Sequence, residues 1–312
     1  MRQRRLGNTG HQVGAIGLGC MGMSWAYTPA ERDDTSSVAL IGEALDLGCG
    51  FVDTSDVYGD GHNEQLVGEA LHERRDDAFL ATKVGLVVED KRTGVVRRDA
   101  SPEHIRSAVE ASLRRLATDA IDLYYLHRVD PQVPLSEQWG ALAELVEQGK
   151  VRHLGLSEVS LDQADAAHRQ HPVTAIQSEL SLWTRSALGE GPPVADGSGG
   201  TREPDDIVGW CARNEAAFVP FSPLGRGFLT GTVTGDDFEG GDMRARNPRF
   251  ATDAMAANQR IVDVVRAVAG RHDATPAQVA IAWTLTRGDH VVPIPGTKKS
   301  RYLRENAAAV DL

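Results

Sequence analysis

Residues 51–59 read FVDTSDVYG, residues 79–85 read FLATKVG and residues 122–130 read DLYYLHRVD. Each stretch contains an apolar or β-branched run of the kind that forms a buried parallel strand. After these runs come four polar side chains that suit acid–base chemistry, Asp53, Tyr58, Lys83 and His127. Parallel α/β folds place their chemistry at the carboxyl ends of the strands, so these side chains are predicted to meet at one mouth.

Strand-like runs alternate with amphipathic helical stretches along the whole chain. Eight runs fit strands, namely AIGLGC (15–20), GFVDTSDV (50–57), AFLATKVG (78–85), AIDLYYLH (120–127), VRHLGLSEV (151–159), TAIQSEL (174–180), AAFVPFSPL (216–224) and HVVPIPGT (290–297). This alternation predicts right-handed βαβ units that close into a (β/α)8 TIM barrel, with a doubly wound open sheet as the alternative. No linker separates the units, so we expect a single domain over residues 1–312.

The segments outside the repeating units also carry predictions. Polar turns within residues 7–10 predict a short N-terminal hairpin that covers the barrel bottom. Long loops over 84–100, 186–206 and 231–256 are expected on the C-terminal face. Segment 186–206 is rich in Gly, Pro, Ser and Asp and is predicted to be the least ordered. It is either a lid over the site or a tolerated insertion.

Composition narrows the class of protein. The chain has 312 residues, 41% of them hydrophobic and 25% charged, as is ordinary for a soluble globular protein. The net charge of −11 repels a phosphate backbone, so nucleic acid is not an expected partner. No apolar run has the length of a membrane span or follows the basic N-terminus, so neither a span nor an export signal is predicted. Three widely spaced cysteines argue against disulfides or a zinc site and favour a reducing cytoplasm.

One motif points to a different nucleotide-binding fold. Residues 17–22 read GLGCMG and satisfy the G-x-G-x-x-G pattern of dinucleotide-binding sites. The following residues do not open directly into a helix, so a pyrophosphate would lack the helix N-terminus that makes the motif work. We therefore expect these glycines to form a close backbone turn at the mouth of the first strand.

The four polar side chains at the strand ends suit the reduction of a carbonyl group. A tyrosine is a poor proton donor unless a cation lowers its pKa, and Lys83 can be that cation for Tyr58. A buried lysine needs a carboxylate, which Asp53 supplies, and His127 can hydrogen-bond the carbonyl oxygen as a neutral imidazole. Taken singly, these residues fit a core aromatic, a structural ion pair and a core histidine. Their clustering at adjacent strand ends favours catalysis.

The chain resembles the aldo-keto reductases over essentially its full length, most closely their bacterial and plant reductase branch. The motifs that carry the resemblance are GFVDTSDVYG, NEQLVGEAL, LHRVDP, GKVRHLGLSE, FSPLGRGFLTG and PIPGTKKSRYLREN, together with the order Asp53, Tyr58, Lys83, His127. The resemblance implies a (β/α)8 barrel that reduces aldehydes and ketones with NADPH and without a metal. It makes Tyr58 the general acid, tuned by Lys83 and Asp53, with His127 orienting the carbonyl.

The same resemblance implies the cofactor site. Ser157 and Gln177 match positions that hold the nicotinamide carboxamide, and Phe221 matches the aromatic that stacks on the ring. The pyrophosphate loop corresponds to Ser222, Pro223, Leu224, Gly225 and Arg226. The 2′-phosphate site corresponds to Gly296, Thr297 and Lys298, and the adenine-reading pair to Glu305 and Asn306. The chain departs from the family in three places. Glu158 replaces a common asparagine, and Tyr302 stands where some branches place an arginine over the adenine. The Gly/Pro insertion after Trp183-Thr184-Arg185 is longer than usual.

Substrate and partners are less defined. Trp25 and Arg128 lie near predicted strand ends and are expected to line an apolar mouth that carries one cation. A small carbonyl compound is the expected partner. A non-catalytic, NADPH-binding regulatory or redox-sensing subunit is the alternative function, because some relatives on this fold regulate other proteins.

Overall fold

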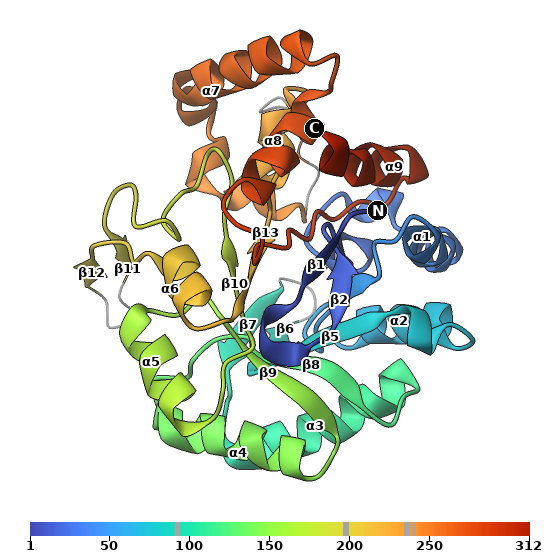
Figure 1. Cartoon of the computed structure of the whole chain (residues 1–312), viewed down its shortest axis with the longest axis vertical. Helices are drawn as coiled ribbons and strands as arrows, with labels where there is room; N and C mark the ends of the chain where they lie inside the picture. The colour runs from blue at the N-terminus through green and yellow to red at the C-terminus, as the bar shows by residue number, and fades with distance from the viewer. Residues whose placement is uncertain (91–93, 196–199, 234–237, 239–240) are drawn as a thin grey trace.

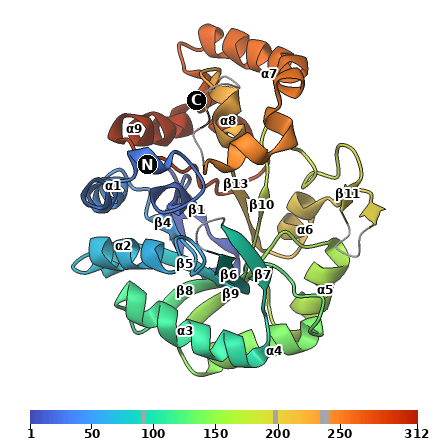
Figure 2. The same ribbon diagram turned by 180° about the vertical axis from the view of Figure 1, so that it is seen from behind.

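The chain forms a barrel of parallel strands surrounded by helices, which Figure 1 and Figure 2 show from its two ends. The computed structural model describes residues 1–90, 94–195, 200–233, 238 and 241–312. The barrel strands are β3 (Leu18–Gly19), β4 (Phe51–Asp53), β5 (Phe79–Val84), β8 (Ile121–Leu126), β9 (Val151–Ser157), β10 (Ala175–Glu179) and β13 (Ala217–Phe221). The helices are α1 (Asp34–Asp46), α2 (His62–Leu71), α3 (Pro102–Leu116), α4 (Leu135–Glu147), α5 (Leu161–Gln170), α6 (Ile207–Arg213), α7 (Thr252–Arg271), α8 (Pro276–Leu285) and α9 (Ser300–Ala308).

The strand order confirms the predicted barrel. Seven strands pair in parallel in the order β13-β10-β9-β8-β5-β4-β3, so strands that follow one another in the chain are neighbours throughout. Helices connect them on the outside, as the ring of ribbons in Figure 1 shows. A doubly wound sheet would instead reverse its strand order at a switch point. The open-sheet alternative is therefore excluded.

The segment 290–297 closes the barrel without forming the regular strand that was predicted there. The amides of Val292 and Ile294 donate to carbonyls of β13 at 2.9 and 3.0 Å. On the other side, the carbonyls of Pro293 and Pro295 accept from glycine amides of the β3 segment at 2.9 and 3.4 Å. Because proline has no N–H, Pro293 and Pro295 cannot donate hydrogen bonds to the β3 segment, and a regular ladder is not completed there. The closing segment therefore pairs through isolated bridges.

The glycines of the GLGCMG motif serve this seam between β3 and the closing segment. A Cβ on Gly19 would lie 2.7 Å from the carbonyl oxygen of Ile294, so only glycine allows the two backbones to meet. Beyond them the chain enters a 3₁₀ turn at Met21–Met23, and the next α-helix begins at Asp34. The motif therefore lacks the helix that a Rossmann phosphate site requires, as the sequence predicted.

A Gly19→Ala variant is expected to lower the free energy of unfolding by about 1–3 kcal/mol, the usual cost of overpacking. Chemical denaturation measures this change. Gly42→Ala is the control, because Gly42 lies within α1 and a Cβ there would meet no atom within 4 Å. The free energy of unfolding of the Gly42→Ala variant should equal that of the wild type or exceed it by up to about 1 kcal/mol. Equal unfolding midpoints for the two variants would contradict the tight crossing at the seam.

The predicted N-terminal hairpin is present and fills the bottom of the barrel. Strands β1 (Gln3–Arg5) and β2 (Gln12–Gly14) pair in antiparallel fashion. Leu6 and Val13 of this hairpin belong to one buried cluster with Phe51 and Phe79 of the barrel strands. The barrel interior is therefore packed side chain against side chain from its lower end, as in other barrels of this type.

Two of the three long loops on the other face contain short strands. Within 84–100, β6 (Leu86–Asp90) and β7 (Val95–Arg98) form an antiparallel hairpin, which the sequence analysis did not predict inside this loop. Within 186–206, β11 (Val194–Ala195) pairs with β12 (Thr201–Arg202), while residues 196–199 lie outside the described residues. The predicted loop 231–256 ends earlier than expected, because α7 begins at Thr252.

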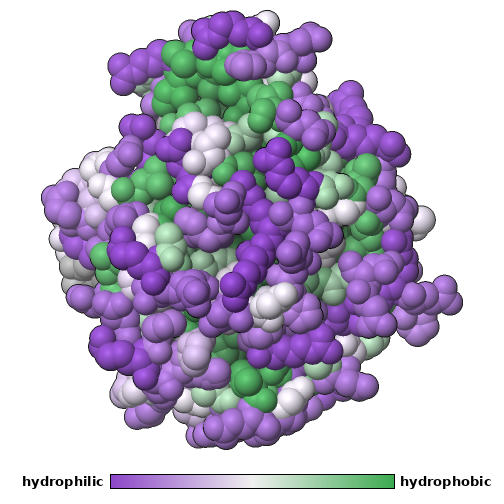
Figure 3. All heavy atoms as spheres, viewed as in Figure 1, coloured by the Kyte–Doolittle hydropathy of each residue, from purple (hydrophilic) through white to green (hydrophobic). Residues whose placement is uncertain are grey.

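The outer surface of the hairpin end is mainly polar. Figure 3 shows apolar surface gathered over α7 on this face. Val264 of α7 is 64% exposed.

Within the described ranges, no helix combines the length and the apolar character that crossing a bilayer requires.

Candidate active site

The four polar residues predicted to meet do lie together at the carboxyl ends of neighbouring strands. Asp53 is the last residue of β4, Lys83 lies one residue before the end of β5, and His127 directly follows β8. Tyr58 comes from the turn after β4. All four are buried, with exposed fractions between 0% for Lys83 and 8% for Tyr58. Three strand ends and one turn therefore place the four side chains in one buried cluster.

Lys83 and Asp53 form a buried ion pair. The Lys83 Nζ donates to Asp53 Oδ1 at 2.5 Å, to the carbonyl oxygen of Thr54 at 2.7 Å and to the Tyr58 hydroxyl at 3.3 Å. Burial acts to lower the pKa of Lys83, but the charge of Asp53, the Tyr58 hydroxyl and the hydrogen bonds to both together outweigh burial, and the pKa is raised. The ammonium group is therefore charged at neutral pH and lies beside the tyrosine.

The Tyr58 hydroxyl is flanked by aromatic rings and one cation. Its ring lies edge-on to Trp25 and to His127, with centroids 6.0 and 5.9 Å apart, and Lys83 Nζ lies 5.0 Å from its centroid. Burial raises the pKa of Tyr58 above its usual value, while the nearby Lys83 charge acts in the opposite direction. The net lowering of the Tyr58 pKa that was expected from Lys83 is therefore not found. The hydroxyl keeps its proton, which is the state a proton donor needs.

His127 is held as a neutral imidazole. Burial, and then the charges of Lys83 and Arg128, lower the pKa of His127 well below its usual value. Its Nδ1 lies 3.2 Å from the Ser55 hydroxyl. Among the described residues, Nε2 has no hydrogen-bond partner. The Ser55 hydroxyl has a single hydrogen and also lies 3.2 Å from Asp56 Oδ1. When this hydrogen goes to Nδ1 of His127, Nε2 carries the imidazole hydrogen and can donate to a ligand oxygen.

Helix α2 supports this arrangement from behind, through two residues that the sequence analysis did not assign. Asn63 Oδ1 accepts from the Thr54 hydroxyl at 2.6 Å, next to the carbonyl that receives Lys83. Glu64 Oε1 accepts from the hydroxyl of Thr82, the residue before Lys83, also at 2.6 Å. Both α2 residues are fully buried. The adjacent Asn-Glu pair, which begins the motif NEQLVGEAL, was the signal available in the sequence.

The predicted carboxamide ligands lie beside the ion pair. Ser157 and Gln177 are direct partners in the register of β9 and β10. Gln177 Nε2 donates to Asp53 Oδ2 at 2.7 Å, and Ser157 Oγ accepts from Arg128 Nη1 at 3.0 Å. The expected cofactor residues are therefore hydrogen-bonded to the expected catalytic and substrate residues. Phe221, at the end of β13, is partly exposed and so retains surface for stacking.

The loop predicted to follow the pyrophosphate, Ser222 to Arg226, starts at this β13 end. Ser222 and Arg226 have positive φ values of 51° and 57°, which is unusual for side-chain-bearing residues and marks a strained turn. Arg226 is not free, because its Nη2 pairs with Glu179 Oε2 at 3.0 Å and its Nη1 reaches the Tyr27 hydroxyl at 3.2 Å. Arg249 joins the same carboxylate at 2.8 Å.

The predicted phosphate and adenine residues follow the closing segment. Gly296 bridges to Gly19 at the seam, and Thr297 accepts a hydrogen bond from the amide of Lys299 at 3.1 Å. Lys298 Nζ donates to the carbonyl of Thr28 at 3.0 Å, and burial lowers the pKa of Lys298. Lys299 Nζ lies 2.9 Å from Glu31 Oε1. Glu31 and its neighbour Arg32 were not assigned, because they precede this segment by about 270 residues.

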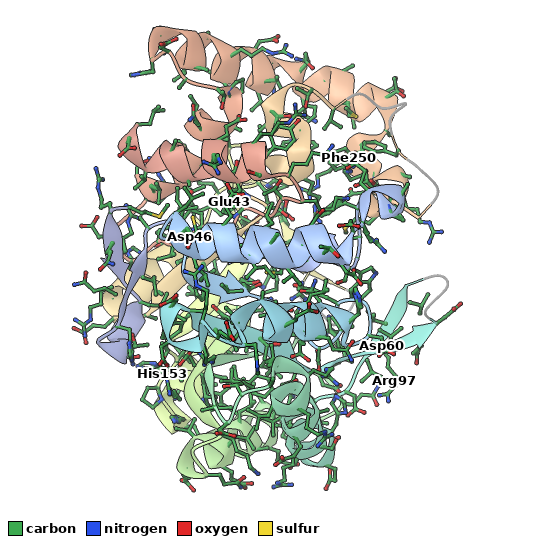
Figure 4. The ribbon with its side chains drawn as sticks, turned by 90° about the vertical axis from the view of Figure 1, so that its right-hand side faces the viewer. Glu43, Asp46, Asp60, Arg97, His153 and Phe250 are labelled. Carbon is green, nitrogen blue, oxygen red and sulfur yellow. The ribbon has the colours of Figure 1, made fainter. Side chains whose placement is uncertain are left out.

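Helix α9 carries the remaining candidates. Tyr302 is 40% exposed, with the Arg301 guanidinium 4.4 Å from its ring centroid. Glu305 accepts from the Thr275 hydroxyl at 2.6 Å, and Asn306 is 3% exposed. Glu305 therefore has a partner within the protein, and Asn306 presents little surface to a ligand. Arg304 pairs with Glu43 at 2.6 Å, and Figure 4 shows Glu43 on α1 beneath α9.

The arrangement as a whole fits an anionic dinucleotide. An aromatic side chain is available at the β13 end, and cations gather around the start of α9 in a chain whose net charge is −11. The Nε of Arg32, in the turn that meets Lys298, is buried without a hydrogen-bond partner in the described part of the chain. Such an orphaned donor suits a phosphate oxygen.

Comparisons with known proteins point the same way. The model of the aldo/keto reductase family matches residues 15–312. A probable aldo-keto reductase 1 of Glycine max is 40% identical over 308 residues, covering 98% of this chain and 83% of that protein. The aldo-keto reductase yakc of Schizosaccharomyces pombe, named with NADP(+), is 38% identical over 310 residues, covering 98% and 86%.

Solved structures are similar over the whole length of the chain. The structure of a glycerol dehydrogenase from Gluconobacter oxydans matches with a TM-score of 0.84 and 30% identity, covering 98% of this chain and 89% of that one. The holo form of an aldo-keto reductase from Bacillus halodurans matches with a TM-score of 0.75 and 26% identity, covering 100% and 91%.

Proposed function

Because the chain belongs to the aldo/keto reductase family, we propose that it reduces an aldehyde or a ketone to the alcohol with NADPH as the hydride source. The observation that carries the proposal is the buried Lys83, within hydrogen-bond reach of both Asp53 and the Tyr58 hydroxyl. The name of the Schizosaccharomyces pombe relative, which carries NADP(+), supports the choice of cofactor.

In this proposal Tyr58 is the general acid. When bound, NADPH would supply the hydride that adds to the carbonyl carbon. Tyr58 gives its hydroxyl proton to the carbonyl oxygen, so that the product is an alcohol. Lys83, kept charged by Asp53, lies 3.3 Å from that hydroxyl and stabilises the tyrosinate left behind. His127 donates from Nε2 to the same carbonyl oxygen and holds it toward Tyr58.

The remaining site residues position the two substrates. Ser157 and Gln177 hold the carboxamide, Phe221 stacks on the nicotinamide, and residues 222–226 follow the pyrophosphate. The 2′-phosphate binds at Gly296, Thr297 and Lys298, next to Lys299. Tyr302, Glu305 and Asn306 lie on the helix that receives the adenine end, where the buried Asn306 offers the smallest contact.

The substrate pocket is bordered by Trp25 and Arg128. Trp25 packs edge-on against Tyr58, at the side where Gly94 of the neighbouring loop approaches its indole, so it forms an apolar wall. Arg128 adjoins His127 and supplies a positive charge at the same mouth. An apolar carbonyl compound that carries an acceptor group fits this pair.

The direct test is consumption of NADPH, followed by its near-ultraviolet absorbance, with a panel of aromatic aldehydes, diketones and keto sugars. We expect turnover with at least one class. Tight NADPH binding without turnover of any compound would instead favour the alternative of a regulatory subunit that binds NADPH without catalysis.

Replacing Lys298 and Lys299 together with alanine is expected to weaken NADPH binding at least about tenfold, because a charge-assisted hydrogen bond contributes roughly 1.5–3 kcal/mol. NADH affinity should stay unchanged, since it lacks the 2′-phosphate. Titration of intrinsic fluorescence measures both affinities, and Lys150→Ala is the control for loss of a partly exposed lysine elsewhere. An equal loss for NADPH and NADH would place the lysines on the shared part of the cofactor or in folding.

A further inference from the structure

The two lysines of the proposed phosphate site already share one carboxylate of the protein. Lys299 Nζ lies 2.9 Å from Glu31 Oε1, and Lys298 Nζ lies 3.7 Å from Glu31 Oε2. Each ammonium group thus faces a different oxygen of the same side chain. This bridging of two cations by one anion is the arrangement that a phosphate group adopts between two lysines.

The turn that carries Glu31 is fixed from both sides. Its 3₁₀ helix, Pro29–Glu31, follows Thr28, which has left-handed φ and ψ values of 34° and 72° that a β-branched residue rarely adopts. The Thr28 amide donates to Asp242 Oδ2 at 3.3 Å, and the Thr28 carbonyl accepts from Lys298 Nζ at 3.0 Å. On the far side Asp33 caps α1. The carboxylate of Glu31 is therefore directed at the lysines by a constrained backbone.

We infer that Glu31 is an internal competitor for the 2′-phosphate and thereby sets how tightly NADPH binds. This inference rests on the proposed function, because it assigns Lys298 and Lys299 to that phosphate. A phosphate with nearly two negative charges displaces a single carboxylate from two lysines, but part of its binding energy is spent on breaking the existing pairs. NADH has no 2′-phosphate and leaves Glu31 in place.

The test is the Glu31→Gln variant, which keeps the shape of the side chain and removes its charge. NADPH is expected to bind about two- to fivefold more tightly, the scale of a partly exposed ion pair, while the affinity for NADH stays unchanged. Titration with adenosine 2′-monophosphate and with adenosine 5′-monophosphate as probes separates the phosphate from the rest of the cofactor. The 2′ compound alone should gain affinity.

Glu110→Gln is the matched control. Glu110, on α3, pairs at 2.6 Å with Lys150, which lies between α4 and β9. Its side chain is 46% exposed, against 44% for Glu31. This control should change neither cofactor affinity. In the Lys298→Ala, Lys299→Ala background, Glu31→Gln should have no effect, because the groups it competes for are gone.

Three results would overturn the inference, namely unchanged NADPH affinity, a gain shared equally by NADH, or a loss of NADPH affinity. A wild-type protein that prefers NADPH, together with an inert Glu31→Gln variant, would reject the competition and leave the proposed function standing. A wild-type protein that binds the two cofactors equally would reject the 2′-phosphate assignment and the inference with it.

Discussion

A Tyr58→Phe variant is expected to bind NADPH like the wild type and to reduce carbonyl compounds at least about 100-fold more slowly, the usual scale for losing a positioned acid. The phenyl ring still fills the space between Trp25 and His127, so the pocket keeps its shape. What is lost is the hydroxyl that lies 3.3 Å from Lys83 Nζ. Steady-state turnover and NADPH titration on the same preparation measure the two effects separately.

Tyr124→Phe is the matched control for this variant. Tyr124 lies on β8, which β5 separates from β4, and it is fully buried in the cluster between the strands and the helices. Removal of the Tyr124 hydroxyl should leave turnover within a few-fold of the wild type. A Tyr58→Phe enzyme that kept more than a third of the activity would exclude Tyr58 as the acid.

A Lys83→Met variant is expected to lose turnover and also to unfold more easily, by about 3–5 kcal/mol. The side chain is completely buried, so methionine fills the space of the stem while Asp53 is left as a carboxylate without its cation. Turnover assays and urea denaturation measure the two losses. Lys150→Met removes a partly exposed pair instead and should cost no more than about 1 kcal/mol.

The double variant Asp53→Asn, Lys83→Met separates the two roles of the pair. Removing both charges eliminates the unpaired buried carboxylate, so stability should return in part while turnover stays low. A Lys83→Met protein with unchanged turnover and an unchanged denaturation midpoint would show that the pair has neither role.

Much of the barrel could be predicted because its strands are buried on both faces and spaced by helices of regular length. The grouping of Asp53, Lys83 and His127 followed from the same logic, since consecutive parallel strands end at one edge. The closing segment was harder. Its apolar residues fit a strand, but Pro293 and Pro295 have no N–H groups with which to donate hydrogen bonds toward β3.

The contacts of the site could not be predicted, because they join residues that the sequence does not relate. Gln177 donates to Asp53 across 124 positions, and Glu31 meets Lys299 across 268. Arg226, in the expected pyrophosphate loop, pairs with Glu179 across 47 positions. Only the fold brings such partners together, and hydrophobic periodicity carries no information about them. The hairpin of β6 and β7 was missed because its strands are short and half exposed.

The barrel seam has a consequence for how the chain is synthesised. The segment that closes the barrel, residues 290–297, follows all seven barrel strands in the chain and lies between β3 and β13. A growing chain on the ribosome therefore holds seven strands with two open edges until residue 296 has emerged. Open parallel edges are templates for pairing with other chains. A protein that stops short of this segment is thus exposed to self-association.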